Sequence, residues 1–476
     1  MLFPTLEFAV FFAIVFVVNW MLRPRRIAWQ LFMLGASLVF YGWWNPRFVL
    51  LLGGSILGNW VLATLVDRTM GPEGRTRTSH NIVRLAVALN LMLLGLFKYY
   101  GFFVESLRSL LGANASFLPL LELTLPVGIS FFTFQALSYV VDVGRGQVRT
   151  LPLLEFAVYL SFFPQLVAGP IVRASEFAPQ LAARPDPRHV PSAEAFRLIF
   201  GGLFKKVVIS TYLAQAIVDR VFLLPGDHSG AEILMAAYGY AIQIYADFSG
   251  YTDIAIGVAL LLGFRFPQNF DSPYRALSIQ DFWRRWHMTL SRWLRDYLYI
   301  PLGGNRVSRL LTYRNLMLTM LLGGLWHGAA WTFVIWGAIH GGMLAAERWI
   351  GEWRRAHDVG PILPEGLSAV IRWFVTFNVV CLAWIFFRAE TFDGAMTMLG
   401  RLGDWSGGAP LVTPLLLLVV FGAILFQFVP QILIVGFDEL LARRGWLVQG
   451  GLLAVGLVLI DVLGPAGVAP FIYFQF

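Results

Sequence analysis

Residues 315–346 read NLMLTMLLGGLWHGAAWTFVIWGAIHGGMLAA, a stretch without a single Asp, Glu, Lys or Arg. About 20 mostly apolar residues are enough to cross the hydrocarbon core of a bilayer. As one helix, the apolar run 315–350 would be about 54 Å long at ~1.5 Å per residue, which is too long for a single crossing. Gly323, Gly324 and Gly328 lie near its middle. We therefore expect two helical segments here, at least one of them short or re-entrant.

The composition of the whole chain also indicates a membrane environment. Of its 476 residues, 58% are hydrophobic and only 13% are charged, and the mean hydropathy is +0.67. A soluble protein keeps about a quarter of its residues charged, because its surface faces water. The chain carries 36 Lys and Arg against 28 Asp and Glu. In a membrane protein this excess is typical of cytoplasmic loops, so we expect the lipid bilayer, and no nucleic acid, as a partner.

Apolar runs recur along the whole chain. The first of them is followed by arginines instead of being preceded by them, which favours a retained helix over a cleavable signal peptide. The pattern predicts an all-α, polytopic transmembrane protein with about 11 membrane helices, plus re-entrant and interfacial helices, in a single domain over residues 1–476. The candidate runs fall near 2–22, 28–45, 48–66, 82–103, 117–141, 152–171, 196–223, 232–263, 315–350, 367–387, 411–436 and 447–468.

The arginines of the loops predict which side of the membrane each loop faces. Loops 23–27, 67–84 and 143–150 lie on one side if the runs between them cross the membrane, and their arginines make that side cytoplasmic and put the N-terminus outside. A crossing by run 152–171 would put the basic segment 264–314 outside. Proline and glycine residues in that run disfavour a straight helix, so we expect it to dip into the membrane and return.

Segment 264–314 is the longest polar stretch, and we expect an interfacial and re-entrant region there. Placed on one helix at about 100° per residue, residues 282–299 divide into an aromatic face and a basic face. Tryptophan and arginine both favour the headgroup layer, so this pattern predicts a helix that lies on the membrane. The aromatic face holds Phe282, Trp283, Trp286, Leu290, Trp293, Leu294, Tyr297 and Leu298, and the basic face holds Arg284, Arg285, Arg292 and Arg295.

His327 lies in the middle of the uncharged run 315–346. An ionisable side chain in such a run is expensive, and it is therefore a functional candidate by default. A neutral imidazole suits this place, because it carries no charge at rest and can still accept a proton. The alternative from residue chemistry alone is a hydrogen bond that bridges two helices. For His340, later in the same run, we expect a packing or hydrogen-bonding role.

Three other ionisable side chains are candidates for function. His287 falls at the edge of the aromatic face of the predicted 282–299 helix, where it is either functional or simply interfacial. Asp247 and Asp253 are embedded in a mostly apolar run, where they could form a proton relay or pair with an arginine that holds helices together.

The motifs of several other chemistries are absent from the sequence. It contains no GxSxG nucleophile elbow, no P-loop and no HExxH zinc motif. Its one cysteine, Cys381, excludes a disulfide within the chain, and we expect it to be a small buried or lipid-facing side chain. We therefore expect no metal site and no permanently bound cofactor.

At its candidate histidines the chain resembles the membrane-bound O-acyltransferase family, in the bacterial branch that acetylates extracellular polysaccharides such as alginate. The motifs that carry this resemblance extend through much of the chain. They are FFPQLVAGPI (162–171), DFSGYTD (247–253), NFDSPY (269–274), DFWRRWHMTLSRWLRDYLYIPLGGNR (281–306), GLWHGAAWTF (324–333) and the ending PFIYFQF (470–476).

The resemblance implies a ring of helices around a central tunnel in the cell inner membrane. A cytoplasmic thioester, either acetyl-CoA or an acyl carrier protein, would be the donor substrate. The acceptor would be a hydroxyl of an extracytoplasmic polysaccharide or a periplasmic partner acetyltransferase. The family's membrane-embedded catalytic histidine maps onto His327, and its second motif residue maps onto His287. Acyl transfer needs a base for the hydroxyl proton and donors for the developing oxyanion, and a dry tunnel strengthens both effects.

Other residues of these motifs are expected to bind substrate. The basic ones could meet the phosphates of CoA or the acidic surface of a carrier protein, although attraction to anionic lipid is an alternative. For the whole protein, the alternatives are a polysaccharide or lipid transporter, which would turn over no thioester, and an envelope-complex scaffold, in which His327→Ala would be silent. The expected substrate-binding residues are Trp326, Asn269, Trp283, Arg292, Arg295, Asp247 and Asp253.

Overall fold

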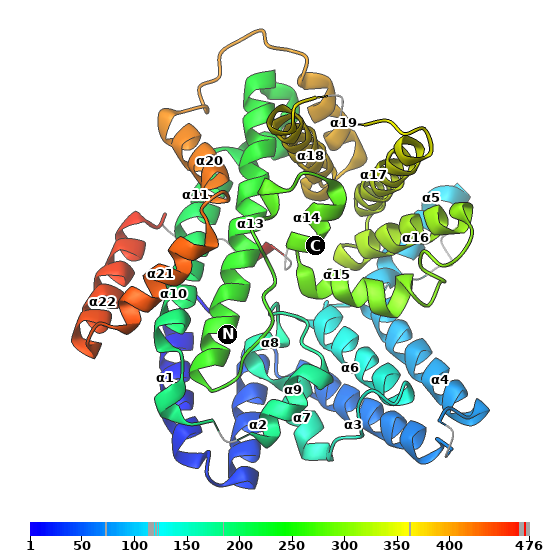
Figure 1. Ribbon diagram of the computed structural model, residues 1–476, viewed down its shortest axis with the longest axis vertical. Helices are drawn as coiled ribbons and strands as arrows, with labels where there is room; N and C mark the ends of the chain where they lie inside the picture. Colours follow the sequence, from blue (N-terminus) through cyan, green and yellow to red (C-terminus); the bar gives the residue numbers. More distant parts are fainter. Residues whose placement is uncertain are drawn as a thin grey trace. The chain divides into compact units, whose positions relative to one another are not determined.

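The computed structural model describes residues 1–71, 74–112, 119, 121, 123–183, 185–360, 363–465 and 471–472 (Figure 1). Across these ranges the regular secondary structure is helical, apart from one isolated bridge between Gly71 and Gly74. The all-α prediction is therefore confirmed for them. Of the C-terminal motif 470–476, only Phe471 and Ile472 are described, and its other residues lie outside the described ranges.

The described chain divides into two compact units. Unit 1 comprises Met1–Ile199 and Tyr251–Pro267, and unit 2 comprises Phe200–Gly250 and Gln268–Phe476. The expectation of a single domain stays a prediction. The helices that begin in unit 1 are α1 (Leu6–Leu22), α2 (Arg26–Gly42), α3 (Arg47–Arg68), α4 (Arg77–Leu94), η1 (Gly95–Tyr99), α5 (Tyr100–Leu111), α6 (Ile129–Gly144), α7 (Leu153–Ser161), α8 (Phe163–Leu166), α9 (Ala174–Ala182), η3 (Pro187–His189) and α10 (Ser192–Leu203).

Unit 2 contains the remaining helices, and the long helix α13 contributes to both units. Three of its shorter elements are π-helices: η4, η5 and η8. The elements are η4 (Phe204–Ser210), α11 (Thr211–Leu213), η5 (Ala214–Val218), α12 (Asp219–Leu223), η6 (Pro225–Asp227), α13 (Gly230–Leu261), η7 (Pro273–Arg275), α14 (Ile279–Arg285), α15 (Met288–Leu294), η8 (Arg295–Tyr299), α16 (Arg309–His327), α17 (Trp331–Ala356), α18 (Glu365–Arg388), α19 (Phe392–Arg401), α20 (Pro414–Phe426), α21 (Gln431–Ala442) and α22 (Trp446–Leu463).

Buried polar side chains connect the apolar helices of unit 1. Trp29 Nε1 on α2 donates a hydrogen bond to Asn19 Oδ1 on α1 at 2.8 Å. Asn90 Nδ2 on α4 donates to Asn59 Oδ1 on α3 at 2.7 Å. In lipid the hydrophobic effect gives helices little reason to associate, so close packing and bonds of this kind hold them together.

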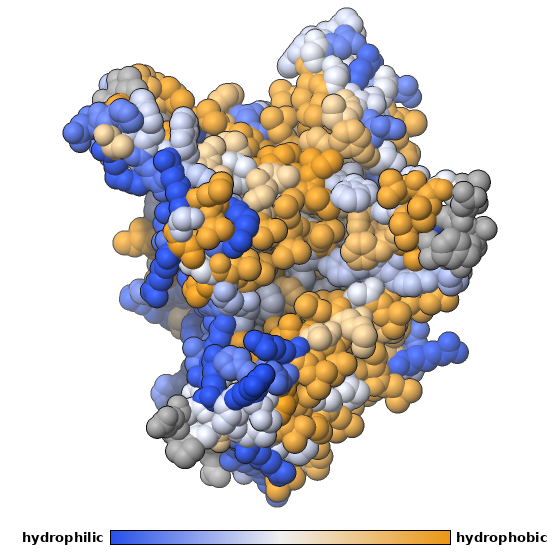
Figure 2. All heavy atoms as spheres, turned by 90° about the vertical axis from the view of Figure 1, so that its right-hand side faces the viewer, coloured by the Kyte–Doolittle hydropathy of each residue, from blue (hydrophilic) through white to orange (hydrophobic). Residues whose placement is uncertain are grey.

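Within the part of the chain that the structure describes, four helical segments are long and apolar enough to cross a membrane: Arg47–Arg68, Arg77–Leu111, Gly230–Leu261 and Glu365–Arg388. Helices α20 and α21 would make a fifth if taken together, although they bend by 92° at their break. The prediction of a membrane protein with several apolar helices stands, whereas a count of about 11 is not confirmed over the described ranges. Figure 2 shows hydrophobic side chains over much of one face, as a lipid-facing surface requires.

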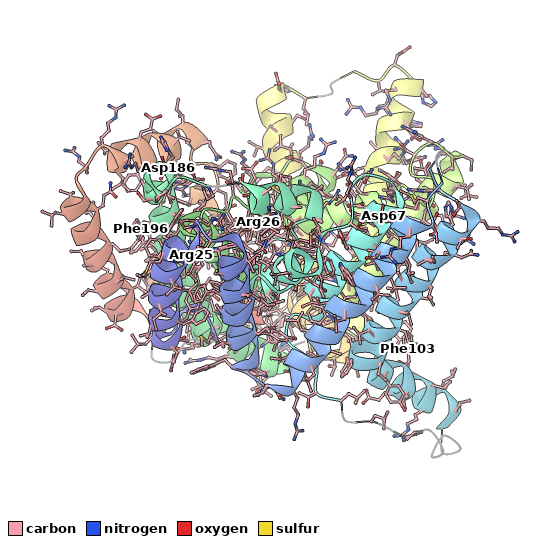
Figure 3. The ribbon with its side chains drawn as sticks, turned by 90° about the horizontal axis from the view of Figure 1, so that it is seen from below. Arg25, Arg26, Asp67, Phe103, Asp186 and Phe196 are labelled. Atoms are coloured by element: carbon pink, nitrogen blue, oxygen red, sulfur yellow. The ribbon has the colours of Figure 1, made fainter. Side chains whose placement is uncertain are left out.

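Two of the loops that we expect on one side of the membrane lie next to each other in unit 1. Thr150, in the loop after α6, donates a hydrogen bond to Asp67 at the end of α3 at 2.8 Å, so these two loops lie together. Figure 3 shows Asp67, Arg26 and Asp186 toward one side of the unit, with Phe103 toward the other.

Run 152–171 does not form a straight membrane-crossing helix. Helix α7 has 9 residues, which corresponds to about 14 Å at ~1.5 Å per residue and is too short to cross. The chain then breaks at Phe162, before the 4-residue helix α8. These short helices agree with the prediction that this run enters the membrane and returns.

The predicted single interfacial helix over 282–299 is wrong. The chain forms α14, then breaks at Trp286 and His287, and continues as α15 and the π-helix η8. The aromatic side chains Phe282, Trp286 and Trp293 are buried within the protein instead of facing the membrane. A helical periodicity distinguishes an apolar face from a polar one, but it does not tell whether lipid or protein covers the apolar face.

The prediction of two segments in 315–350 is confirmed by the break between α16 and α17. These helices have 19 and 26 residues, and α16 begins at Arg309, before the run. The expectation that at least one of the two segments is short or re-entrant stays a prediction. They run side by side as a hairpin in Figure 1. Three glycines permit this close approach: a Cβ on Gly324 would overlap the carbonyl oxygen of Phe333, one on Gly337 would overlap that of Met320, and one on Gly341 would lie 3.0 Å from Met317 Sδ.

Candidate active site

His287 lies in the break between α14 and α15 and is fully buried. Its φ angle is +42°, in the left-handed region that few non-glycine residues adopt. Asn269 holds it there, because Asn269 Oδ1 accepts hydrogen bonds from Thr289 N at 3.2 Å and Thr289 Oγ1 at 2.9 Å and lies 3.1 Å from His287 Nδ1. Asn269 thus caps α15 and contacts the histidine with the same oxygen.

These contacts assign the state of the His287 imidazole. Because Asn269 Oδ1 can only accept, Nδ1 carries the proton and Nε2 carries the lone pair. His287 stands outside the membrane-crossing helices, and burial lowers its pKa to about 3. The imidazole is therefore neutral at physiological pH, with Nε2 as its basic nitrogen.

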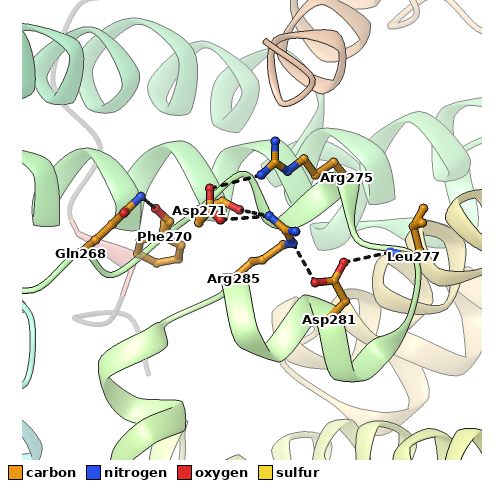
Figure 4. A network of polar contacts seen from close by, with 7 residues as sticks. All are labelled: Gln268, Phe270, Asp271, Arg275, Leu277, Asp281 and Arg285. Carbon is orange, nitrogen blue, oxygen red and sulfur yellow. Dashed lines mark hydrogen bonds and ion pairs between the residues drawn. The ribbon is translucent and has the colours of Figure 1, made fainter. Parts of the chain in front are cut away.

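A network of ion pairs fixes the segment that carries Asn269 and His287 (Figure 4). Arg285, at the end of α14, bonds to Asp281 at 2.9 Å and to Asp271 at 3.0 Å. Asp271 N in turn donates to the carbonyl of Arg285 at 2.9 Å. The loop that carries Asn269 is thereby tied to the end of α14, which explains how the strained backbone at His287 is kept in place.

His327 is the last residue of α16 and only 2% exposed. Its imidazole is enclosed by aromatic rings, with centroid separations of 5.0 Å to Trp326, 5.1 Å to Trp336 and 5.3 Å to Phe387. The carbonyl end of a helix carries a partial negative charge, which stabilises a cation there.

Trp326 connects the two histidines. Its ring centroid lies 5.9 Å from that of His287 and 5.0 Å from that of His327. Trp326 is itself buried. The structure thus brings together three of the predicted site residues, with Asn269 directly behind His287.

The far side of His327 is lined by aromatic residues, most of which the sequence analysis did not select as site residues. Trp336 touches His327 and also contacts His340 at 4.8 Å and Trp384 at 5.6 Å between ring centroids. The predicted residue Trp283 belongs to this group, because its ring lies 5.6 Å from Trp336 and 5.3 Å from His340. The sequence signal that could have pointed to this group is the spacing of Trp336 and His340, which lie one helical turn apart on α17.

The two predicted arginines lie at the edge of this region. Arg292 is half-buried on α15, within the same short helix that Asn269 caps. Arg295 is exposed and forms an ion pair with its neighbour Asp296 at 2.7 Å. Both residues are therefore near the chain segment of His287.

Asp247 pairs with a lysine and not with an arginine, which corrects one expected alternative. Its carboxylate contacts Lys206 Nζ, and both side chains are almost completely buried. Ser210 Oγ and Ile472 N also donate to it, at 3.3 Å and 2.8 Å. The pair lies near the site through the next residue, Phe248, whose ring stands edge-on to His287 at 4.7 Å.

Asp253 is half-buried and belongs to unit 1, whereas the site described above is formed within unit 2. The expectation that Asp253 binds substrate therefore stays a prediction. Within the described ranges, no three His, Cys, Asp or Glu side chains gather as a metal ion requires.

Comparison with known proteins identifies the class to which this site belongs. Residues 76–387 match MBOAT, the membrane-bound O-acyltransferase family. The matched region contains both histidines, Asn269 and the α16–α17 hairpin. The chain belongs to this family and is an O-acyltransferase of the membrane.

Its relatives are named for the transfer of acetyl or D-alanyl groups. It is 42% identical to the probable alginate O-acetylase AlgI of Pseudomonas aeruginosa, over 85% of this chain and 76% of that protein. It is 40% identical to the peptidoglycan O-acetyltransferase of Helicobacter pylori, over 79% of this chain and 74% of that protein. The teichoic acid D-alanyltransferase of Bacillus subtilis is 26% identical, over 56% of this chain and 69% of that protein.

Proposed function

We propose that this protein transfers an acetyl group from a cytoplasmic thioester to a hydroxyl outside the inner membrane, with His327 as the catalytic base. The acceptor is a polysaccharide, or a periplasmic acetyltransferase that passes the group on. The observation that carries the proposal is the position of His327, at the buried end of α16 inside a cage of aromatic rings and next to a second, neutral histidine.

The chemical step follows from this position. The acceptor hydroxyl oxygen attacks the thioester carbonyl carbon while a nitrogen of His327 takes the hydroxyl proton. The tetrahedral intermediate then expels the thiolate, and His327 returns the proton to the sulfur. The products are an ester and a thiol, and the histidine is unchanged. The aromatic cage excludes the water that would otherwise hydrolyse the donor.

His287 supports this step from the other side of Trp326. With Nδ1 held by Asn269, its Nε2 is oriented as a hydrogen-bond acceptor. A neutral acceptor of this kind suits a hydroxyl or the amide N–H of a pantetheine arm. Arg292, on the same short helix, suits the phosphate of that arm, which is common to CoA and to acyl carrier proteins.

The nature of the substrates rests on the relatives. Those with the higher identity over most of this chain are named as O-acetylating enzymes of alginate and of peptidoglycan. This supports acetyl as the acyl group and a sugar hydroxyl as the acceptor. A tunnel through the helices would let donor and acceptor approach His327 from opposite sides.

The test of the base is His327→Ala in cells or vesicles that make the acceptor polymer. We expect O-acetyl ester to disappear while the protein still inserts and elutes as a single species in detergent. His357→Ala is the matched control, because His357 is exposed and follows the last residue of α17. Wild-type ester content in His327→Ala would contradict the proposal and would leave a scaffold or a transporter as the function.

The direction of transfer has a separate test. His327 follows Arg314 on α16 at a distance of about 20 Å, at ~1.5 Å per residue, which reaches the middle of a bilayer from a cytoplasmic Arg314. Protein reconstituted in sealed vesicles of known orientation should acetylate an acceptor outside from a donor confined inside. Product that forms only when both substrates share one side would refute transfer across the membrane.

A further inference from the structure

Several buried hydrogen-bonding groups next to His327 have no partner among the described residues. The indole N–H groups of Trp336 and Trp286 are among them, and these two side chains are at most 1% exposed. Neither ring nitrogen of the fully buried His340 has a partner in the described part of the chain. Native proteins pair nearly all of their buried polar groups, so several such groups in one cluster indicate a site for a ligand.

These groups form one continuous cluster. Trp336 stands at its centre, with ring centroids 5.1 Å from His327, 4.8 Å from His340 and 5.6 Å from Trp384. Trp286 extends it through a contact of 5.0 Å with Trp384. The cluster therefore begins at the proposed base and continues away from it.

The chemistry of the cluster is that of a hydrogen-bond donor site. An indole N–H can only donate, and a neutral imidazole adds one donor and one acceptor. Donors thus outnumber acceptors, and the indoles and imidazoles that make these contacts carry no formal charge. Such a lining suits an oxygen that is neutral when it binds and becomes negative during the reaction.

Trp336 is also held rigidly. It lies on α17 within one turn of Gly337, whose backbone approaches the carbonyl of Met320 on α16 so closely that no Cβ fits between them. His327 ends that same α16. The N–H of Trp336 and the imidazole of His327 are therefore fixed relative to each other by one helix hairpin, which is the preorganisation that a transition-state contact requires.

We propose that Trp336, together with His340, binds the carbonyl oxygen of the acyl group and stabilises the oxyanion that forms on it. The inference rests on the proposed acyl transfer. When the acceptor oxygen bonds to the carbonyl carbon, the C=O electron pair moves to the carbonyl oxygen, and the Trp336 N–H and a His340 N–H donate to it. The electron pair re-forms the C=O bond as the C–S bond breaks. The departing sulfur takes the proton from His327 and leaves as a thiol.

The experiment removes the N–H and keeps the ring. Trp336 is replaced by 3-benzothienylalanine, in which sulfur stands where the indole has its N–H. The same replacement at Trp373 is the control, because its N–H already donates to Tyr274 O at 2.8 Å. With S-acetylpantetheine as donor and alginate oligosaccharides as acceptor, we expect kcat to fall by about 10²–10³-fold at position 336. KM for the donor and the unfolding temperature should hardly change, and the Trp373 variant should retain its kcat.

A second measurement distinguishes this role from a merely structural one. In the dithioacetyl analogue of the donor, sulfur replaces the carbonyl oxygen and accepts hydrogen bonds poorly. Wild-type protein should lose much of its rate with this analogue, whereas the position-336 variant and His340→Phe should be slowed much less by it. Equal sensitivity of all three proteins to the analogue, or a wild-type kcat in the position-336 variant, would overturn the inference.

The failure of the proposed function has a different signature. In that case wild-type protein would form no ester from any acetyl thioester supplied. If the wild type is active and His327→Ala is not, an unchanged position-336 variant refutes the oxyanion role alone.

Discussion

Gly337→Ala is the substitution that most directly tests how the hairpin positions the site. A Cβ at position 337 would overlap the Met320 carbonyl oxygen and lie 3.0 Å from its carbonyl carbon and 3.1 Å from Leu321 Cα. Ordinary carbon contacts are about 3.5–4.0 Å, so α16 and α17 must separate by roughly 0.5–1 Å. All of the neighbouring atoms are backbone, so no side-chain rotation can relieve the contact.

Two effects of this separation can be estimated. Overpacking of this kind typically costs about 1–3 kcal/mol of the free energy of unfolding. A displacement of about 1 Å between catalytic groups can lower a rate by about 10²-fold. We therefore expect the acetyl-transfer rate of Gly337→Ala to fall by about 10–100-fold although His327 and Trp336 are both retained.

Gly342→Ala on the same helix is the control. The nearest atom to a Cβ there is the flexible Met317 Cε at 4.0 Å, so the added methyl meets no obstacle. Alanine is also about 1 kcal/mol better than glycine inside a helix, so this variant should be as stable as the wild type or more so. Thermal unfolding and initial rates in the same detergent provide the comparison. Equal behaviour of the two variants would refute the view that the hairpin contact sets the site geometry.

Three further predictions concern the surroundings of the site. Asp247→Asn should lower the free energy of unfolding, measured with heat or denaturant, by about 3–5 kcal/mol, because it leaves the buried Lys206 ammonium without the opposing charge. The double change Lys206→Met with Asp247→Leu should recover most of this loss. Arg292→Glu should weaken the binding of acetyl-CoA or acyl carrier protein in detergent by roughly tenfold, because it removes one charge-assisted hydrogen bond. The control Arg284→Glu, at an exposed position, should leave this binding unchanged. Equal binding by both variants would favour a role of these arginines in lipid contact. Burial lowers the pKa of His287 from 6.5 to about 3, so the unfolded chain binds a proton before the folded protein does as the pH falls. The contribution of the neutral His287 to the free energy of unfolding should therefore be complete above about pH 6.5 and should decline toward pH 3. An equally steep decline in His287→Gln would contradict this assignment.

Much of the helical organisation could be predicted because it follows from composition. A run without charge that is interrupted by glycines indicates a helix, a break and a second helix, and α16 and α17 follow this pattern. His327 is a candidate for the same reason, since an ionisable residue in such a run is costly. The family motif and the physical argument select the same residue.

The local structure around His287 could not be predicted from periodicity. Residues 282–299 have the pattern of one amphipathic helix, yet the backbone turns at His287 because Asn269, distant in sequence, caps the helix that begins after it. The partner of Asp247 was missed for a similar reason. A lysine on the π-helix η4 and an aspartate on α13 meet only through the tertiary fold.

The glycine contacts between α16 and α17 have a practical consequence for redesign. Because the hairpin holds the proposed base and the proposed oxyanion donors in one piece, substitutions within it are expected to damage catalysis before they alter selectivity. Mutant libraries that seek a new acceptor sugar should therefore leave residues 317–341 intact and vary the surrounding chain. The proposed reaction centre is a fixed part of the fold, and substrate choice must be engineered around it.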